Sequence, residues 1–143
     1  MAEDIYTIRV SVYGMPAPEL ERVVAAGAGF TPGMLLEIDS SGLFQYHSTS
    51  DKGGKPSIIA VENYLLGKTI SDPYIAGEIA VACVGRSGDV FQMIPSISTT
   101  IGDRLTSNGD GRLKAGGIGD DGAIIGVALE AVGPNELCKV MIA

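Results

Sequence analysis

The sequence predicts an all-β protein with one compact, barrel-like domain, and three features of the chain lead to this prediction. Short apolar segments alternate with clusters of Gly, Asp, Ser and Pro, which is the pattern of short strands joined by tight turns. Glycine accounts for 20 of the 143 residues and is spread along the whole chain, about twice its usual share. A chain of this length forms one domain and can bury roughly two-thirds of its unfolded surface.

The first part of the chain predicts a strand followed by a linker. Residues Ile8 to Val12 alternate apolar and polar side chains, as a half-buried strand does. Two prolines and several glycines follow, and only residues 18–27 could form a short helical turn. We therefore expect residues 1–30 to form an N-terminal strand or arm with a linker, and residues 31–143 to form the β body.

The expected body consists of strands separated by turn-forming residues. Three segments carry residues that tolerate positive φ at tight bends, namely Asp39–Gly42, Gly85–Asp89 and Ser107–Gly111. Antiparallel hairpins are therefore expected. The apolar segments are Met34–Ile38, Leu43–His47, Ser57–Leu66, Glu78–Val84, Asp89–Ile94, Gly111–Ala115, Ala123–Ala131 and Leu137–Ile142.

A weak internal repeat divides the body into two similar β units. Residues 33–45 align without gaps to residues 102–114, so that Gly42 matches Gly111. Each copy is followed, after a variable loop, by a related segment, 57–63 in the first and 123–130 in the second. Because the matched order extends over two elements in each copy, we favour a duplication over the chance recurrence of Gly-turn-strand patterns.

Charge and cysteine usage narrow the function classes. Ten Lys+Arg against 17 Asp+Glu give a net charge of −7, which disfavours nucleic acid and anionic membranes as partners. No apolar run is long enough to span a membrane, and the first residues lack the pattern of a secretory signal, so we expect a soluble protein. Cys83 and Cys138 lie in apolar strand-like segments, which favours buried, reduced thiols.

The residues that could carry chemistry predict no catalytic, cofactor or metal site. A G-x-G-x-x-G string at 117–122 lacks the buried strand of a dinucleotide site and carries two aspartates where phosphates would lie. The loop at 103–111 has no glutamate where a calcium loop needs its closing ligand, so we expect an acidic turn there. His47 is the only histidine and lies in a polar segment, where we expect an exposed loop residue.

Several motifs from residue 72 onward occur in a recognisable order. A Tyr-x-x-Gly-Asp/Glu segment is followed by a Gly-Asp-Val turn, a Gly-Asp-x-Leu segment with a Gly-Asp-Gly turn, and an I-G-V-A-L-E segment. These places are filled by Tyr74, Gly77 and Glu78, by Gly88, Asp89 and Val90, by Gly102, Asp103, Leu105, Gly109, Asp110 and Gly111, and by Ile125 to Glu130. With the earlier I-A-V-E at Ile59–Glu62, the chain over roughly residues 31–143 resembles the small head decoration proteins of tailed bacteriophages.

This resemblance implies a β-tulip fold and a non-enzymatic structural role. A decoration protein of this kind assembles in the host cytoplasm onto the virion. It binds the major capsid protein at the outer surface of the expanded head, clusters as trimers, and stabilises the mature head against the pressure of packaged DNA. Two other classes stay open: another β-rich virion component, such as a tail-tube or head-completion protein, and a small ligand-binding or hydrolytic accessory domain that uses His47 and nearby carboxylates.

Two groups of residues are the expected contacts of such a protein. The segment before the linker could add a strand to a capsid sheet edge or to a neighbouring copy, although it could equally be the first strand of the barrel. Its residues are Ile5, Tyr6, Ile8, Val10, Val12 and Tyr13. The expected trimer contacts, which the sequence alone does not distinguish from core residues, are Tyr64, Leu65, Leu66 and Tyr74.

Overall fold

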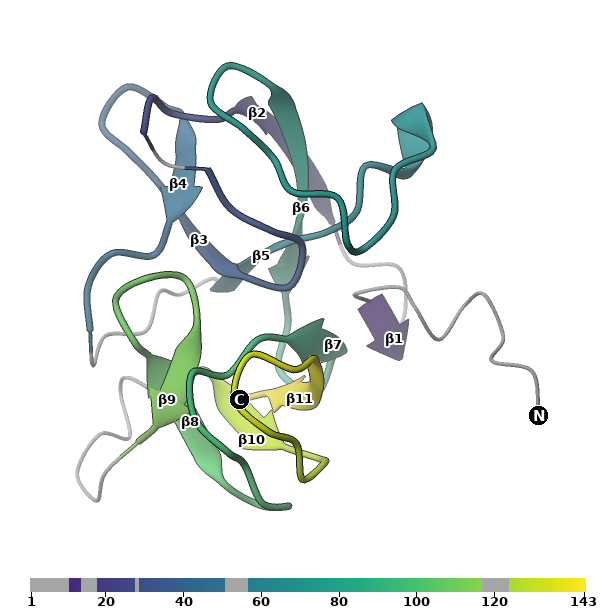
Figure 1. Cartoon of the computed structure of the whole chain (residues 1–143), viewed down its shortest axis with the longest axis vertical. Coiled ribbons are helices and arrows are strands. Elements are labelled where there is room, and N and C mark those ends of the chain that lie inside the picture. Colours follow the sequence, from purple (N-terminus) through teal and green to yellow (C-terminus); the bar gives the residue numbers. More distant parts are fainter. Residues whose placement is uncertain (1–10, 14–17, 28, 51–56, 117–123) are drawn as a thin grey trace.

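The computed structural model describes residues 11–13, 18–27, 29–50, 57–116 and 124–143, with the backbone alone for residues 11–13. Within these ranges the chain forms two antiparallel sheets, and its helical content is a 3₁₀ turn, η2 (Tyr64–Leu66) (Figure 1). The prediction of an all-β protein is therefore confirmed. No helix in the described part of the chain is long and apolar enough to cross a membrane.

The two sheets are built from two consecutive parts of the chain. We call β2 to β6 the first unit and β7 to β11 the second unit. The first unit contains β2 (Glu19–Val23), β3 (Leu35–Ile38), β4 (Phe44–Tyr46), β5 (Ser57–Ala60) and β6 (Ile79–Gly85). The second unit contains β7 (Val90–Met93), β8 (Arg104–Ser107), β9 (Leu113–Ala115), β10 (Gly126–Ala128) and β11 (Cys138–Ile142).

Both units have the same strand order. The first sheet runs β2-β6-β5-β3-β4, and the second runs β7-β11-β10-β8-β9 with β1 (Ser11–Tyr13) added outside β7. In each unit the first strand therefore pairs with the last strand, and a hairpin forms the opposite edge. The repeated segments of the sequence fall on the two hairpins, β3–β4 and β8–β9, so the duplication inferred from the sequence extends to the whole topology.

Backbone conformation and hydrogen bonding repeat as well. Gly42 and Gly111 have φ of +79° and +84° at the equivalent hairpin turns, a conformation in which glycine avoids the steric cost of a Cβ. The Ala25 amide donates to the Phe44 carbonyl at 2.9 Å, and at the equivalent place the Ser96 amide donates to the Leu113 carbonyl at 2.7 Å. The two turn glycines thus mark in the sequence the positions where each hairpin needs a positive φ.

Each sheet curls toward a barrel without closing along a whole strand. A single parallel bridge links Val24, just after β2, to Phe44 in β4, and the matching bridge links Pro95 to Leu113 in β9. Among the described residues no further pairing joins β2 to β4 or β7 to β9, and β1 lies along the outer edge of β7. The expected barrel is therefore present as two partly closed sheets, one per unit, instead of a single barrel completed by both halves.

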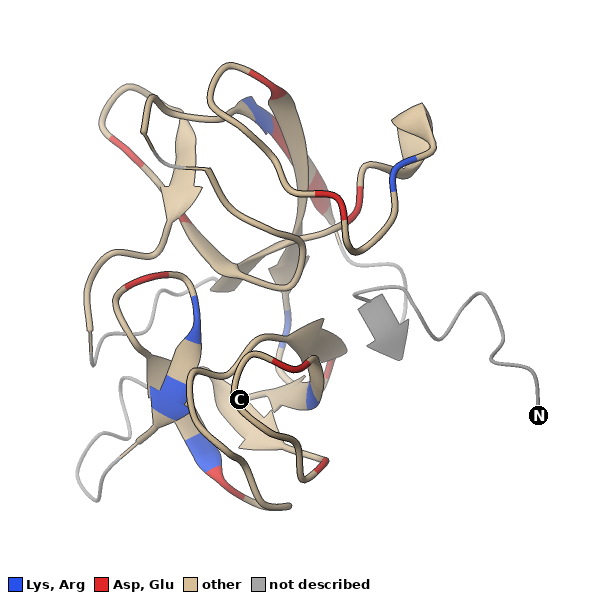
Figure 2. Ribbon diagram, viewed as in Figure 1, with Lys and Arg blue, Asp and Glu red and all other residues tan. Residues whose placement is uncertain are grey.

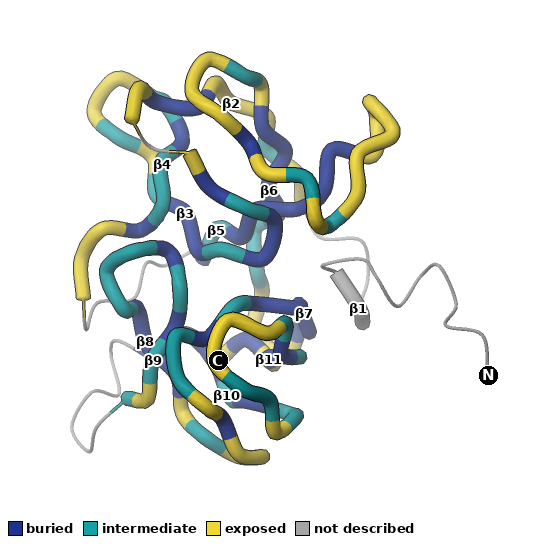
Figure 3. The backbone as a smooth tube through the Cα atoms, viewed as in Figure 1, coloured by how far each residue is buried: buried dark blue, intermediate teal, exposed yellow. Residues whose placement is uncertain are grey.

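The hydrophobic core holds the two units together. Side chains alternate between the two faces of the first sheet, so that Leu36 packs inside the first unit whereas its neighbour Leu35 packs against the second. The larger cluster combines Leu35, Ile59 and Val81 of the first unit with Phe91 and other residues of the second. Figure 3 shows buried stretches along the strands of both units and exposed ones at η2 and the outer turns. The units therefore share the larger of two hydrophobic clusters, and the smaller one lies within the first unit.

The segment expected to form a helical turn is a strand instead. Residues Glu19–Val23 form β2, which pairs with β6 over its whole length. Glutamate, leucine and arginine favour helices intrinsically, but a strand partner distant in sequence overrides this preference. Because β2 belongs to the first sheet, part of the expected linker is a structural strand.

Both cysteines are buried and free, as the sequence predicted. Burial raises the pKa of the Cys83 thiol to about 12 and also raises that of Cys138. Thiols with such pKa values are poor nucleophiles at neutral pH, since the thiolate is the reactive form. These side chains are therefore core residues.

Candidate interaction surfaces

The described part of the expected arm pairs within its own chain. In β1, Ser11 lies opposite Phe91 and Tyr13 opposite Val90, with an irregularity between the two pairs. These three residues thus form an ordinary strand at the edge of the sheet, which was the alternative to an arm that contacts another chain. The expected contacts Ile5, Tyr6, Ile8 and Val10 lie outside the described residues, and Val12 lies within β1.

Three of the four expected trimer contacts form an exposed apolar projection at η2. Leu65 and Leu66 are 63% and 70% exposed, and Tyr64 is also exposed. The Tyr64 hydroxyl donates to Glu19 Oε2 at 2.8 Å, which ties the projection to β2, and this hydrogen bond raises the pKa of Tyr64. Exposed leucines at the tip of a short turn are available to a partner, so their role in a trimer stays a prediction.

Tyr74, the fourth expected trimer contact, lies in the core. It is 5% exposed, and its ring packs on that of Phe30 with the centroids 5.4 Å apart. Its hydroxyl donates to the Val61 carbonyl at 2.7 Å, and burial raises its pKa to about 12. Its side chain is therefore not available to a neighbouring copy in this structure.

His47 lies between the two units and is buried, so the expectation of an exposed loop residue was wrong. It is 8% exposed, and its Nδ1 lies 2.9 Å from Oγ of Ser107 in the second unit. The His47 carbonyl accepts the Gly111 amide at 3.2 Å, and the Leu35 amide donates to the Gly111 carbonyl at 2.8 Å. The hairpin β8–β9 of the second unit covers the histidine, which joins the two units.

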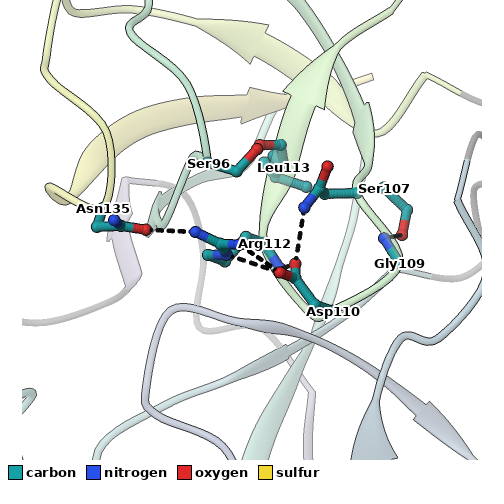
Figure 4. Close-up of polar contacts among 8 residues, drawn as sticks. Ser96, Ser107, Gly109, Asp110, Arg112, Leu113 and Asn135 are labelled. Atoms are coloured by element: carbon teal, nitrogen blue, oxygen red, sulfur yellow. Dashed lines mark hydrogen bonds and ion pairs between the residues drawn. The ribbon is translucent and has the colours of Figure 1, made fainter.

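The tip of that hairpin is held by a charged network (Figure 4). Arg112 Nε donates to Asp110 Oδ2 at 2.9 Å, and Arg112 Nη1 donates to Asn135 Oδ1 at 2.7 Å. The side-chain amide of Asn108 donates from Nδ2 to Asp110 Oδ1 at 3.1 Å. The hydrogen bonds from Arg112 lower the pKa of Asp110. Both oxygens of this carboxylate are engaged by the turn, as the expected acidic turn requires.

Charged side chains are unevenly distributed over the described surface. Figure 2 shows basic residues along the hairpin β8–β9, where Arg104, Arg112 and Lys114 lie. Lys114 Nζ donates to Ser50 Oγ at 2.7 Å, which links this hairpin to the loop after β4. Among the described residues, no group of three His, Cys, Asp or Glu side chains is placed to hold a metal ion.

The exposed side chains of the sheet edge formed by β2 were not singled out from the sequence. Val23 and Ile79 lie opposite each other on β2 and β6 and are 39% and 57% exposed. Asn63, just before η2, donates from Nδ2 to the Ile79 carbonyl at 3.5 Å. The open strand edge, these two aliphatic side chains and the projection at η2 therefore lie on one side of the first unit. Charged and apolar residues alternate only over Glu19–Glu21, so the sequence carried little signal for this edge.

The fold is similar to that of a phage head protein. Comparison with protein-family models and with curated proteins finds no match. The solved structure of the N base of the head fiber gp8.5 of bacteriophage phi29 matches this fold with a TM-score of 0.59 and 15% sequence identity, over 88% of this chain and 95% of that chain. The chain thus shares its fold, over nearly its whole length, with the base of a phage head fiber.

Proposed function

We propose that this chain is a non-enzymatic structural protein of a tailed-phage virion. It binds the major capsid protein on the outer surface of the expanded head, as trimers, and stabilises the mature head. Assembly takes place in the host cytoplasm. The observation that carries this proposal is the similarity of fold to a head fiber base over 88% of the chain.

Two further features support a structural role. The ordered motifs from Tyr74 to Glu130 resemble those of phage head decoration proteins, independently of the fold comparison. The two units share the larger hydrophobic cluster, which suits a small body that must resist mechanical force without separating into halves. A core shared in this way unfolds cooperatively.

Stabilisation of the head follows from selective binding. A ligand that binds one of two states shifts the equilibrium toward that state by its difference in affinity. A protein that binds the expanded lattice and not the unexpanded one therefore opposes any return or rupture of the expanded shell. The binding free energy of each copy adds to the stability of the head.

The test is co-sedimentation of the purified protein with expanded and with unexpanded heads of a parent phage that lacks it. We expect saturable binding to expanded heads and a stoichiometry of three copies for each local threefold position. A protein of similar mass and charge that is foreign to the phage serves as the control for non-specific binding. Absence of binding to both kinds of head would refute the proposal.

The same experiment separates the other classes of function. A tail-tube or head-completion protein would assemble into rings or tubes, or bind at one vertex only, and would leave the faces of the head bare. An accessory domain that uses His47 would lose its activity in His47→Ala. Because His47 is buried against Ser107, we expect that substitution to lower the stability of the fold.

A further inference from the structure

At the edge of the first sheet, alternate residues of β2 carry backbone groups that pair with no other described strand. The Val24 amide donates to the Glu78 carbonyl at 2.8 Å, and the Val84 amide donates to the Pro18 carbonyl at 2.8 Å. In an antiparallel ladder, pairs that exchange hydrogen bonds alternate with pairs that do not. The amides and carbonyls of Glu19, Glu21 and Val23 therefore point away from β6, toward the open edge.

The equivalent edge of the second unit is occupied. The first strand of that unit, β7, is the counterpart of β2, and β1 pairs with its outer edge. Val90 and Gln92, the residues of β7 that match Glu19 and Glu21, are buried, with exposed fractions of 5% and 8%. Glu19 and Glu21 are exposed. The duplicated fold thus offers the same edge twice, and the described chain fills it once.

Self-pairing of β2 between two copies is disfavoured by its charges. An antiparallel pair of β2 strands centred on the middle of the strand places Glu21 opposite its counterpart, and like charges directly opposite each other are destabilising. Two glutamates on an exposed edge favour instead a strand that carries a basic side chain. The segment Ile5–Val10 contains three aliphatic residues, Ile5, Ile8 and Val10, and one charged residue, Arg9.

We propose that the segment before β1 in one copy adds as a strand to the β2 edge of a second copy. Arg9 then lies within reach of Glu19 or Glu21, and Ile5, which shares the face of Arg9 in an extended strand, lies near Val23. Because Arg9 is only two residues before Ser11, where β1 begins on β7, the contact places the β2 edge of the second copy directly beyond the start of β1. Repetition of this contact around a ring gives a closed, head-to-tail assembly.

Amide hydrogen exchange tests this contact at residue level, on the full-length protein and without any capsid. We expect the amides of Glu19, Glu21 and Val23 to exchange at least about tenfold more slowly in concentrated protein than in dilute protein, because each gains a hydrogen-bond partner. The amides of Leu20 and Arg22 already face β6 and serve as internal controls. Deletion of residues 1–10, which retains β1, should abolish the dependence on concentration.

A second pair of variants keeps the test independent of the deletion. Glu21→Pro removes an amide that points outward, so it should block the contact while β2 still pairs with β6. Glu21→Ala removes the same carboxylate but keeps the amide, and should retain the dependence on concentration. Circular dichroism of each variant confirms that the fold is retained.

The outcomes decide between three arrangements. Protection that depends on concentration and on residues 1–10 supports exchange between copies. Protection that depends on residues 1–10 in protein that sediments as a monomer shows that the segment folds back on its own chain, and it overturns the proposal. Equal exchange in the full-length and deleted proteins also overturns it. Because no head is present, failure here leaves binding to the expanded head to be judged by co-sedimentation.

Discussion

The contact between the two units can be measured with a pair of equivalent glycines. Gly42 and Gly111 occupy matching turns with φ of +79° and +84°, so replacement by alanine strains the backbone similarly at both, by roughly 1–2 kcal/mol. The surroundings differ. A Cβ at Gly42 meets only Arg22 Nη1 at 3.2 Å, whereas a Cβ at Gly111 would lie 2.6 Å from Met34 Cε and 2.9 Å from Tyr46 Cβ.

The expected difference between the two variants follows from these distances. Overpacking of a filled site costs about 1–3 kcal/mol in addition to backbone strain. Gly42→Ala should therefore lower the free energy of unfolding by about 1–2 kcal/mol and Gly111→Ala by about 2–5 kcal/mol. Met34 and Tyr46 belong to the first unit and Gly111 to the second. The additional loss of stability in Gly111→Ala over Gly42→Ala therefore measures how tightly the units pack.

Urea unfolding monitored by circular dichroism measures both values. A difference of about 2 kcal/mol separates the two midpoints by about 1 M urea when the slope is near 2 kcal/mol/M. Tyrosine fluorescence should give coincident transitions, because the shared core makes unfolding cooperative. Equal losses of stability in the two variants, or a smaller loss in Gly111→Ala, would refute the packing of this hairpin against the first unit.

Three further results are expected. His47→Ala should lower the free energy of unfolding by about 1–3 kcal/mol, since it removes a buried side chain and its hydrogen bond with Ser107, whose hydroxyl keeps only the Gly109 amide. Urea unfolding measures this loss, and an unchanged midpoint would contradict the burial of His47. Because the pKa of Cys83 is raised from 9.0 to about 12, its contribution to stability is complete below pH 9 and is lost as the pH rises toward 12. Urea midpoints measured across this range should fall less steeply in Cys83→Ala than in the wild-type protein, and equal slopes would contradict the assignment. Leu65→Ser combined with Leu66→Ser should leave the melting temperature nearly unchanged, because both side chains are exposed, yet reduce the number of copies bound per head; undiminished binding would remove the projection from the trimer interface.

The sequence predicted those parts of the fold that depend on local conformation. Gly42 and Gly111 mark turns that need positive φ, and the strands on either side of them lie where the apolar segments indicated. The repeat in the sequence covered only the hairpins and the strands that follow them. The equivalence of β2 with β7 and of β6 with β11 appears only in the pairing, because packing constrains topology more strongly than it constrains sequence.

The errors in prediction arise from contacts between distant residues. The composition of Glu19–Val23 favours a helix, but pairing with β6 fixes it as a strand. His47 lies in a polar segment, and its burial depends on a hairpin about sixty residues later, where Ser107 accepts or donates its hydrogen bond. Tyr74 and Tyr64 are both tyrosines near apolar residues, and only the fold places one in the core and the other at the surface.

The most direct test of attachment to the head is an image of it. Expanded heads that lack the protein can be incubated with the purified chain and examined by electron cryomicroscopy with icosahedral averaging. We predict additional density for three copies at local threefold positions on the outer surface, with the two units of each copy resolved, and no such density on unexpanded heads. Heads whose faces remain bare at saturating protein, or density confined to one vertex, would contradict the proposed function.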